Sequence, residues 1–355
     1  MNIPERMKHF NVPGISVTYF AYGKINWSKH WGTLEKGADK AVDDNTIFHA
    51  CSISKMITAI CVLKLAQYGE LDLYKDVNEY LTSWKIPDNE FTKMKKITLA
   101  NLLSHQAGLY DCEDGFGPYK HGDNVPTPID ILKGATPYNP EAVHAKYEPE
   151  TDCAYSDAGY CIISQVLLDV LGETVPQAAN WNIFKPLGLK RTFFWKPGKN
   201  DYDGISMDDC VVGHDNDGEI VEQIRAAYPN LAGAALWTTT RELASIVIDL
   251  IKSYQGKSGL ILNQEMAQLM LTPYGCASDL GLGVFLDKDK DGKPYFFSQG
   301  WGVGMQCKLR AYYEGQSGVV VMTNSEPGME QDESLVGEII EYVCNANGAV
   351  FGFLK

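Results

Sequence analysis

The 355-residue sequence has no run of the roughly 18 apolar residues that a membrane-spanning helix requires. Residues 1–9 also lack a basic region followed by an apolar core, so no secretory signal is expected there. The nine cysteines form no CxxC pair and no regular spacing, which disfavours a zinc ribbon, a redox dithiol motif and a disulfide framework. These absences predict a cytoplasmic protein with free thiols in a reducing compartment.

Basic residues are also scarce. The sequence has 31 Lys and Arg against 45 Asp and Glu, which gives a formal net charge of −14. Such a chain repels the phosphates of nucleic acids and anionic membrane surfaces, so neither is an expected partner. Hydrophobic residues at 45% still allow a packed core, and the length fits two domains or one large α/β body with an insertion.

Several common catalytic and metal-binding motifs are missing. The sequence contains no GxSxG, no HExxH, no Walker A and no GxGxxG after a strand, and its seven histidines show no metal-ligand spacing. Residues 287–292 (DKDKDG) begin like a calcium loop, but Ser298 stands at the twelfth position, where an EF-hand needs Glu. A polar hairpin turn is the favoured interpretation, and no metal site is predicted.

Strand patterns lie at both ends of the chain and helical patterns in the middle. This order predicts an α+β fold, with a sheet domain from 1–72 plus 236–355 and a mainly helical domain, 73–235, inserted between them. Residues 115–140 are rich in Gly, Pro and Asp and predict a long surface loop. The expected strands are 14–20, 25–32, 282–286, 295–298, 305–313 and 318–323, and the expected helices are about 52–68 (ended by Gly69), 98–104, 158–171, 239–253 and 332–345.

One short motif indicates chemistry. Ser52 and Lys55 form an S-x-x-K at the start of the apolar 52–68 helix. A helix-capping serine followed by a solvated lysine has the same spacing, so the motif alone is weak evidence. Its position favours catalysis, because residues three apart share one face and this helix would carry Lys55 into the interior. Desolvation is expected to lower the pKa of that lysine and let it take the serine proton. Neighbouring His49 is interpreted as a structural, hydrogen-bonded histidine rather than a base.

Residues 48–55 (FHACSISK) resemble the nucleophile segment of serine β-lactamases and penicillin-binding proteins, and more narrowly the class C β-lactamase, esterase and D-aminopeptidase branch. That family pairs S-x-x-K with a Y-x-N motif and a third motif, K-T-G or H-x-G, on a strand. The resemblance implies a β-lactamase/transpeptidase-like fold, with an antiparallel sheet flanked by helices and a mainly helical second domain. Further similar segments follow in the family's order: 102–109 (LLSHQAGL), 183–189 (IFKPLGL), 232–239 (AGAALWTT) and 322–324 (MTN).

The second and third motifs depart from the family's pattern. Tyr155 and Asp157 approximate Y-x-N, with Asp in place of Asn. Residues 298–304 (SQGWGVG) stand at the third motif, where Gly300 is retained but Ser298 replaces the usual cation or imidazole. Both changes make the site more negative. If Asp157 lies beside Lys55, its charge opposes the desolvation of the lysine, so Tyr155 is expected to carry more of the base role.

The resemblance also implies roles for these residues. Ser52 attacks a carbonyl and forms an acyl-enzyme, Lys55 and Tyr155 share the general-base role, and no metal or organic cofactor takes part. The backbone amides of Ser52 and Trp301 are expected to form the oxyanion hole. The residues expected to bind substrate are Asp157, Ser298, Gln299, Gly300 and Trp301.

Three functions remain open at this point. The first is a serine hydrolase of esters or amides, of β-lactamase-like, carboxylesterase or D-amino-acid peptidase type. The second is an acyltransferase that uses the same acyl-enzyme, and the third is a non-catalytic penicillin-binding-like protein. For each, the expected ligand is a small molecule or peptide with an ester, amide or lactam carbonyl.

Overall fold

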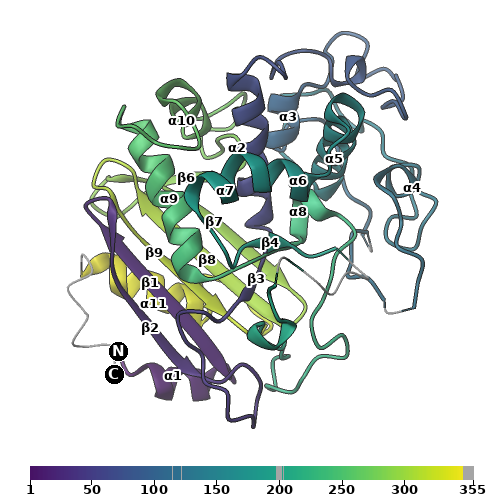
Figure 1. Cartoon of the computed structure of the whole chain (residues 1–355). Coiled ribbons are helices and arrows are strands. Elements are labelled where there is room, and N and C mark those ends of the chain that lie inside the picture. Colours follow the sequence, from purple (N-terminus) through teal and green to yellow (C-terminus); the bar gives the residue numbers. More distant parts are fainter. Residues whose placement is uncertain (114, 121, 197–201, 203, 347–355) are drawn as a thin grey trace.

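The structure is a computed structural model that describes residues 1–113, 115–120, 122–196, 202 and 204–346. Its main sheet has six strands in the order β2-β1-β9-β8-β7-β6, and every neighbouring pair is antiparallel (Figure 1). The two ends of the chain meet inside this sheet, where Ile15 pairs with Thr323. The strands are β1 (Gly14–Ala21), β2 (Lys24–Gly32), β6 (Phe285–Lys288), β7 (Pro294–Gly302), β8 (Met305–Tyr312) and β9 (Ser317–Thr323).

Helices cover both faces of the sheet, which explains why all eight residues of β1 are buried. Helices α1 (Ile3–His9) and α11 (Leu335–Asn345) pack on one face, and α9 (Thr240–Tyr254) packs on the other (Figure 1). Strand β9 follows the twofold periodicity of a strand. Val319 and Val321 belong to the core beneath α1 and α11, whereas Val320 belongs to the core on the opposite face.

A second, three-stranded sheet has the order β3-β5-β4, from β3 (Phe48–Cys51), β5 (Leu236–Thr238) and β4 (Phe193–Phe194). The sequence patterns did not predict these short strands. Strand β3 leads directly into α2 (Ser54–Gln67), so this small sheet fixes the start of the S-x-x-K helix. The domain division at residues 72 and 235 stays a proposal, and β4, which lies within 73–235, pairs with β5 beyond it.

The middle of the chain supplies most of the remaining helices. The expected loop at 115–140 contains a short helix, α4 (Pro128–Leu132), so that prediction was wrong for this part; Thr127 and Asp130 cap it reciprocally. Helix α5 (Asp157–Leu171) ends at Gly172, whose φ of 67° is in the left-handed region that favours glycine. The other helical elements are η1 (Val77–Glu79), α3 (Leu99–Leu103), α6 (Val175–Ala179), η2 (Asn180–Phe184), α7 (Lys185–Leu187), η3 (Met207–Asp209), α8 (Leu231–Ala234) and α10 (Gln264–Met270).

The polar turn predicted at 287–292 is confirmed. It joins β6 to β7, and the Asp289 carboxylate accepts the backbone N–H groups of Asp291 and Lys293. An Asp side chain that bonds to backbone two residues on is typical of a tight turn.

Among the described residues, no single helix combines the length and the apolar character needed to cross a membrane. One sharply bent pair, α5 with Val175–Leu187, meets both criteria by length and composition alone. Most of α5 is buried inside the protein.

Candidate active site

Ser52 lies in a tight turn between β3 and α2. The turn begins at Cys51, whose φ of 47° is in the left-handed region, and it closes with the Ile53 N–H on the Ala50 carbonyl at 3.0 Å. The N-cap of α2 is Ile53, with no side-chain cap. The capping alternative for Ser52 is therefore excluded, and its hydroxyl is left at the front of the helix.

Helix α2 confirms the apolar helix expected at 52–68, and Gly69 follows it with a φ of 75°. Every residue from Ser54 to Leu65 is buried. The Ser54 hydroxyl donates to the Cys51 carbonyl at 2.5 Å and accepts from the Leu236 N–H at 2.9 Å, which ties the helix start to both β3 and β5. The helix thus carries Lys55 into the interior.

Lys55 is 3% exposed, and each of its three ammonium protons has an acceptor. Its Nζ lies 3.3 Å from Ser52 Oγ, 2.7 Å from Asp157 Oδ1 and 3.0 Å from the Gly233 carbonyl oxygen. A lysine whose three donors are all engaged is held in its charged form.

The pKa of Lys55 follows the same logic. Burial alone would lower it, but the charge and the hydrogen bond of Asp157, together with Tyr155, raise it above its usual value. The lowering expected from desolvation is therefore overturned, because the carboxylate at 2.7 Å outweighs the loss of water.

Tyr155 lies at the mouth of the site. The Lys55 Nζ is 4.7 Å from its ring centre, and the ring stacks on His105 at 4.4 Å. The residue is 47% exposed, yet its hydroxyl interacts with both Ser52 and Lys55. Desolvation of that hydroxyl raises the pKa of Tyr155, and the positive charge of Lys55 opposes this only in part. Ser52, Lys55 and Tyr155, predicted from motifs far apart in the chain, are thus brought together.

His105 positions the segment that carries Tyr155. Its Nδ1 accepts the Ser156 N–H at 3.1 Å, and its own backbone carbonyl accepts the Ala154 N–H at 3.0 Å. Burial, assisted by the charge of Lys55, lowers the pKa of His105 to about 3. The imidazole is therefore neutral, as an acceptor at Nδ1 requires. Sequence reasoning noted His105 only as part of a family-like segment.

Asp111 is a residue that sequence reasoning missed. Its carboxylate accepts hydrogen bonds from the Ser156 hydroxyl at 2.9 Å, the Asp157 N–H at 2.6 Å and the Ala158 N–H at 3.0 Å, at the N-terminus of α5. Burial, and then the charge of Asp157, raise the pKa of Asp111. This carboxylate fixes the start of α5, and with it both Tyr155 and Asp157.

Asp157 pairs with Lys55, and its own side chain is partly buried. The Asn230 side-chain amide donates to its Oδ1 at 3.2 Å and to its backbone carbonyl at 2.9 Å. Gly233 leaves room for it, because a Cβ there would lie 2.5 Å from Asp157 Oδ1. Asn230 and Gly233 therefore hold the carboxylate against Lys55; neither stood out in the sequence as a site residue.

Ser298 and Gln299 line the same narrow cavity as Ser52, Lys55 and Tyr155. The volume open to water in this cavity is about 10 Å³, close to what one water molecule needs. Gln299 Oε1 is buried and has no hydrogen-bond partner in the described part of the chain. The cavity is completed by Leu103, His105, Leu280, Gly281, Gly283, Val284 and Phe285.

Gly300 and Trp301 follow along β7, next to the turn that holds Ser52. A Cβ on Gly300 would lie 2.5 Å from the Ala50 carbonyl oxygen and 2.8 Å from the Cys51 Cβ. Glycine is thus needed for β7 to pack against the end of β3. Trp301 is partly exposed beyond this contact.

His49 has a structural role, as predicted. It is buried, its Nε2 bonds to the Ala234 carbonyl at 2.5 Å, and its ring stacks between Tyr228 and Trp237. These contacts hold β3 against the segment that precedes β5.

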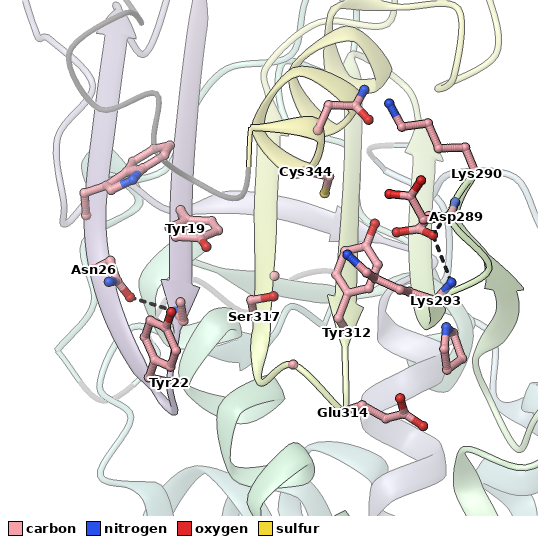
Figure 2. A pocket seen from close by; sticks show the side chains of 17 residues that line it. Tyr19, Tyr22, Asn26, Asp289, Lys290, Lys293, Tyr312, Glu314, Ser317 and Cys344 are labelled. Atoms are coloured by element: carbon pink, nitrogen blue, oxygen red, sulfur yellow. Dashed lines mark hydrogen bonds between the residues drawn. The ribbon is translucent and has the colours of Figure 1, made fainter.

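A larger cavity, of about 800 Å³, lies at the main sheet and shares no lining residue with the cavity at Ser52. Figure 2 shows Tyr19 and Asn26 of the β1–β2 hairpin on one side, Lys290 and Lys293 of the β6–β7 turn on the other, and Ser317 of β9 between them. Among the described residues that line it, no lysine is hydrogen-bonded to a serine. This cavity is large, but its described lining residues do not form the lysine–serine contact that would activate a nucleophile.

Comparisons with known proteins agree with this geometry. The family model of beta-lactamase matches residues 2–342. The chain is 27% identical to penicillin-binding protein 4 of Amycolatopsis lactamdurans, over 53% of this chain and 46% of that protein. It is 28% identical to the teichoic acid D-alanine hydrolase of Staphylococcus aureus, over 51% of this chain and 41% of that protein. The chain therefore spans less than half the length of either relative.

Solved structures share the fold. The D-amino acid amidase of Ochrobactrum anthropi SV3, complexed with L-phenylalanine amide, superimposes with a TM-score of 0.75 over 97% of this chain and 96% of that one, at 19% identity. This likeness supports the antiparallel sheet flanked by helices that the sequence predicted.

Proposed function

Because the chain belongs to the β-lactamase family, we propose that it is a serine hydrolase that forms an acyl-enzyme at Ser52 and cleaves esters or amides. The observation that carries this proposal is the 3.3 Å contact between Lys55 Nζ and Ser52 Oγ, with the Tyr155 hydroxyl beside both. A nucleophile within reach of a base that is itself oriented by a third group is the arrangement covalent catalysis needs.

The proposed roles follow from the protonation states. Lys55 is an ammonium ion whose three protons are engaged, so it stabilises negative charge rather than taking a proton. Tyr155 is the general base: its phenolate, which the charge of Lys55 stabilises only in part and which therefore forms at alkaline pH, takes the Ser52 proton as Oγ attacks the carbonyl. The phenol then returns the proton to the leaving group, and a water activated by the same phenolate releases the acyl group.

The backbone amides of Ser52 and Trp301 are the proposed oxyanion hole. Support comes from Gly300, which lets β7 pack within van der Waals contact of Ala50 and Cys51, directly before Ser52. Donors fixed in this way to backbone are pre-organised for a developing oxyanion, an effect worth a few kcal/mol.

The proposed substrates have an uncharged leaving group or carry an amine. Asp157 and the absence of a cation at Ser298 make the site less favourable for a carboxylate, and Gln299 Oε1 is an unused acceptor for an N–H donor. The names of two similar proteins, a teichoic acid D-alanine hydrolase and a D-amino acid amidase, suggest esters or amides of amino acids. Ser298, Gln299, Gly300 and Trp301 would contact such a substrate, while Asp157 acts through Lys55.

Partners and location are proposed on composition. A net charge of −14 favours a small-molecule or peptide substrate over nucleic acid. All nine cysteines are free thiols and five of them are buried, which favours a reducing compartment such as the cytoplasm.

The test is covalent labelling with a fluorophosphonate or a fluorescent penicillin, followed by mass mapping. The proposal expects one label, on Ser52, and its loss in Ser52→Ala. A label on another residue, or none with either probe, would overturn the acyl-enzyme. Product analysis with and without an added amine or alcohol acceptor then separates hydrolysis from acyl transfer.

A further inference from the structure

Two cysteines outside the proposed catalytic residues face each other at the protein surface. Cys153 Sγ lies 3.7 Å from Cys276 Sγ, although 123 residues separate them in the sequence. Cys276 is exposed and Cys153 is partly exposed, so solvent reaches this pair.

Hydrogen bonds hold the Cys276 thiol and the backbone beside both cysteines in place. The Gln106 side-chain oxygen accepts from the Cys276 N–H at 2.9 Å and from its thiol at 3.3 Å, and the Gln106 amide donates to the Tyr274 carbonyl at 2.8 Å. On the other segment, the Ala154 N–H, next to Cys153, donates to the His105 carbonyl at 3.0 Å. Since His105 and Gln106 are neighbours, one short segment anchors both cysteines.

We propose that Cys153 and Cys276 form an oxidation site, at which a hydroperoxide converts the two thiols into a reversible intramolecular disulfide. The Cys276 thiol gives up its proton, its thiolate attacks the outer oxygen of the hydroperoxide, and the O–O bond breaks; the departing alkoxide, or hydroxide from hydrogen peroxide, takes up that proton and leaves as an alcohol or water. Cys153 sulfur then attacks the sulfenic acid on Cys276, the S–S bond forms and hydroxide leaves, to be protonated by the Cys153 proton. Two thiols lose two electrons, and the hydroperoxide is reduced by two.

The environment assigns the order of these steps. Burial, and then the hydrogen bond and charge of Cys276, raise the pKa of Cys153 to about 12, so Cys153 is not the residue that reacts first. Cys276 is the more exposed thiol. Once it is a sulfenic acid it no longer carries the thiolate charge that disfavours ionisation of Cys153, and the second step follows.

A second thiol pair provides the contrast. Cys51 and Cys307 interact with each other, but both are buried, and burial raises the pKa of Cys51 far above its usual value. A buried thiol without access to oxidant is inert. The two pairs therefore differ in the solvent exposure of their thiols and not in whether the thiols interact.

The disulfide would act on the cavity at Ser52, a consequence that rests on the proposed function. Cys153 lies two residues before Tyr155, and Cys276 lies four residues before Leu280, which lines the cavity with Tyr155. Bond formation shortens the 3.7 Å separation to about 2 Å and draws these two segments together. In a cavity this narrow, oxidation is expected to exclude large acyl groups more than small ones.

The test uses the full-length, reduced protein treated with hydrogen peroxide, alkylated and analysed by peptide mass mapping. The expected product is a peptide pair joined through Cys153 and Cys276, with both thiols recovered by dithiothreitol. Cys153→Ser and Cys276→Ser should each abolish it. Cys112→Ser is the matched control, because Cys112 is also partly exposed but its thiol donates to Asn139. Free alkylation of both cysteines after treatment, or disulfides only to other cysteines or between chains, would overturn the site.

The effect on the cavity has its own readout. In the oxidised protein, kcat/KM for p-nitrophenyl hexanoate should fall relative to that for p-nitrophenyl acetate by up to about 10²-fold, the cost that a displacement of about 1 Å can have. An unchanged ratio, with the disulfide present, would refute the narrowing but leave the oxidation site standing. The mass measurement needs no turnover, so it is independent of the assignment of Ser52.

Discussion

Two of the cavities in the described part of this protein differ in the residues that line them. The larger, near 800 Å³, is lined by tyrosines, lysines and a serine spread over the β1–β2 hairpin, the β6–β7 turn and β9 (Figure 2). The smaller, near 10 Å³, holds Ser52, Lys55 and Tyr155 in mutual contact. This difference shows that the volume of a cavity is a poor guide to its chemistry. Close packing brings the reactive groups of the smaller cavity together, and the same close packing leaves little empty space there.

The largest expected effect separates the two cavities directly. Ser52→Ala should lower kcat/KM for p-nitrophenyl acetate by about 10⁴-fold or more, because the nucleophile is lost. Ser317→Ala, in the larger cavity, should leave it unchanged. Both variants should keep the far-ultraviolet circular dichroism of the native protein. Equal activity in the wild type and Ser52→Ala would contradict the comparison.

Removal of the proposed general base, Tyr155, should have the next largest effect on kcat/KM. Tyr155→Phe should lower kcat/KM by about 10²- to 10⁴-fold, the range of general-base contributions. Because the pKa of Tyr155 is raised, the wild-type rate should still increase above neutral pH as the phenol ionises, and this increase should be absent from the variant.

Tyr160→Phe is the control for that experiment, since its buried hydroxyl donates to the Leu103 carbonyl in the same ring cluster. It should lose stability, about 1 kcal/mol, and keep the pH profile. A wild-type rate that declines from neutral to alkaline pH, with no unfolding, would count against Tyr155 as the base.

Substrate charge should have a smaller effect. A lost charge-assisted hydrogen bond of about 1.5–3 kcal/mol corresponds to about 10- to 150-fold, so nitrocefin, with its carboxylate, should be hydrolysed poorly relative to a neutral ester or D-alanine p-nitroanilide. Two distant arginines already have partners in the described structure: Arg225 donates to the Cys210 and Val211 carbonyls, and Arg310 pairs with Glu341.

The converse variant tests the cause. Ser298→Lys should raise β-lactam acylation if the missing cation is responsible. Nitrocefin turnover by the wild type near 10⁶ M⁻¹ s⁻¹, within the range of efficient enzymes, would falsify the prediction.

The smallest expected effect is a shift of the pH profile. The charge of Asp157 raises the pKa of both Lys55 and Tyr155, so Asp157→Asn should lower both and move the rising limb of kcat/KM to lower pH. Asp111→Asn removes a neighbouring charge that does not contact Lys55, so it should leave the limb in place while weakening the start of α5. Identical shifts in the two variants would mean that the total negative charge near the site, and not the 2.7 Å contact between Asp157 and Lys55, determines the pH of the rising limb.

Much of the fold followed from sequence periodicity. The apolar run at 52–68 is long enough to predict α2 as a helix buried on all sides. The patterns at 14–32 and 305–323 are long enough to predict the central strands, because a strand must bury at least one face. The small sheet was missed since β3, β4 and β5 have four residues or fewer, and their pairing joins segments up to about 190 residues apart.

The site was predictable only in part. S-x-x-K is local, so its spacing alone predicted that Ser52 and Lys55 lie close together, although Ser52 lies in the turn before α2 rather than in the helix. The partners that set their protonation are not local: Asp111 lies 46 residues before Asp157, and Asn230 lies 73 residues after it. Whether desolvation or the carboxylate determines the pKa of Lys55 depends on a 2.7 Å distance that no spacing encodes.

The pairing of β1 with β9 also governs how the chain folds. Strands far apart in the sequence are neighbours in the sheet, with Ile15 opposite Thr323, so the sheet cannot close until residues as far as Thr323 have been synthesised. Such high contact order requires a long loop to close before the pairing stabilises anything, which slows folding. Until β9 is available, the β1 edge of the β1–β2 hairpin is unpaired, and an unpaired strand edge is a template for aggregation.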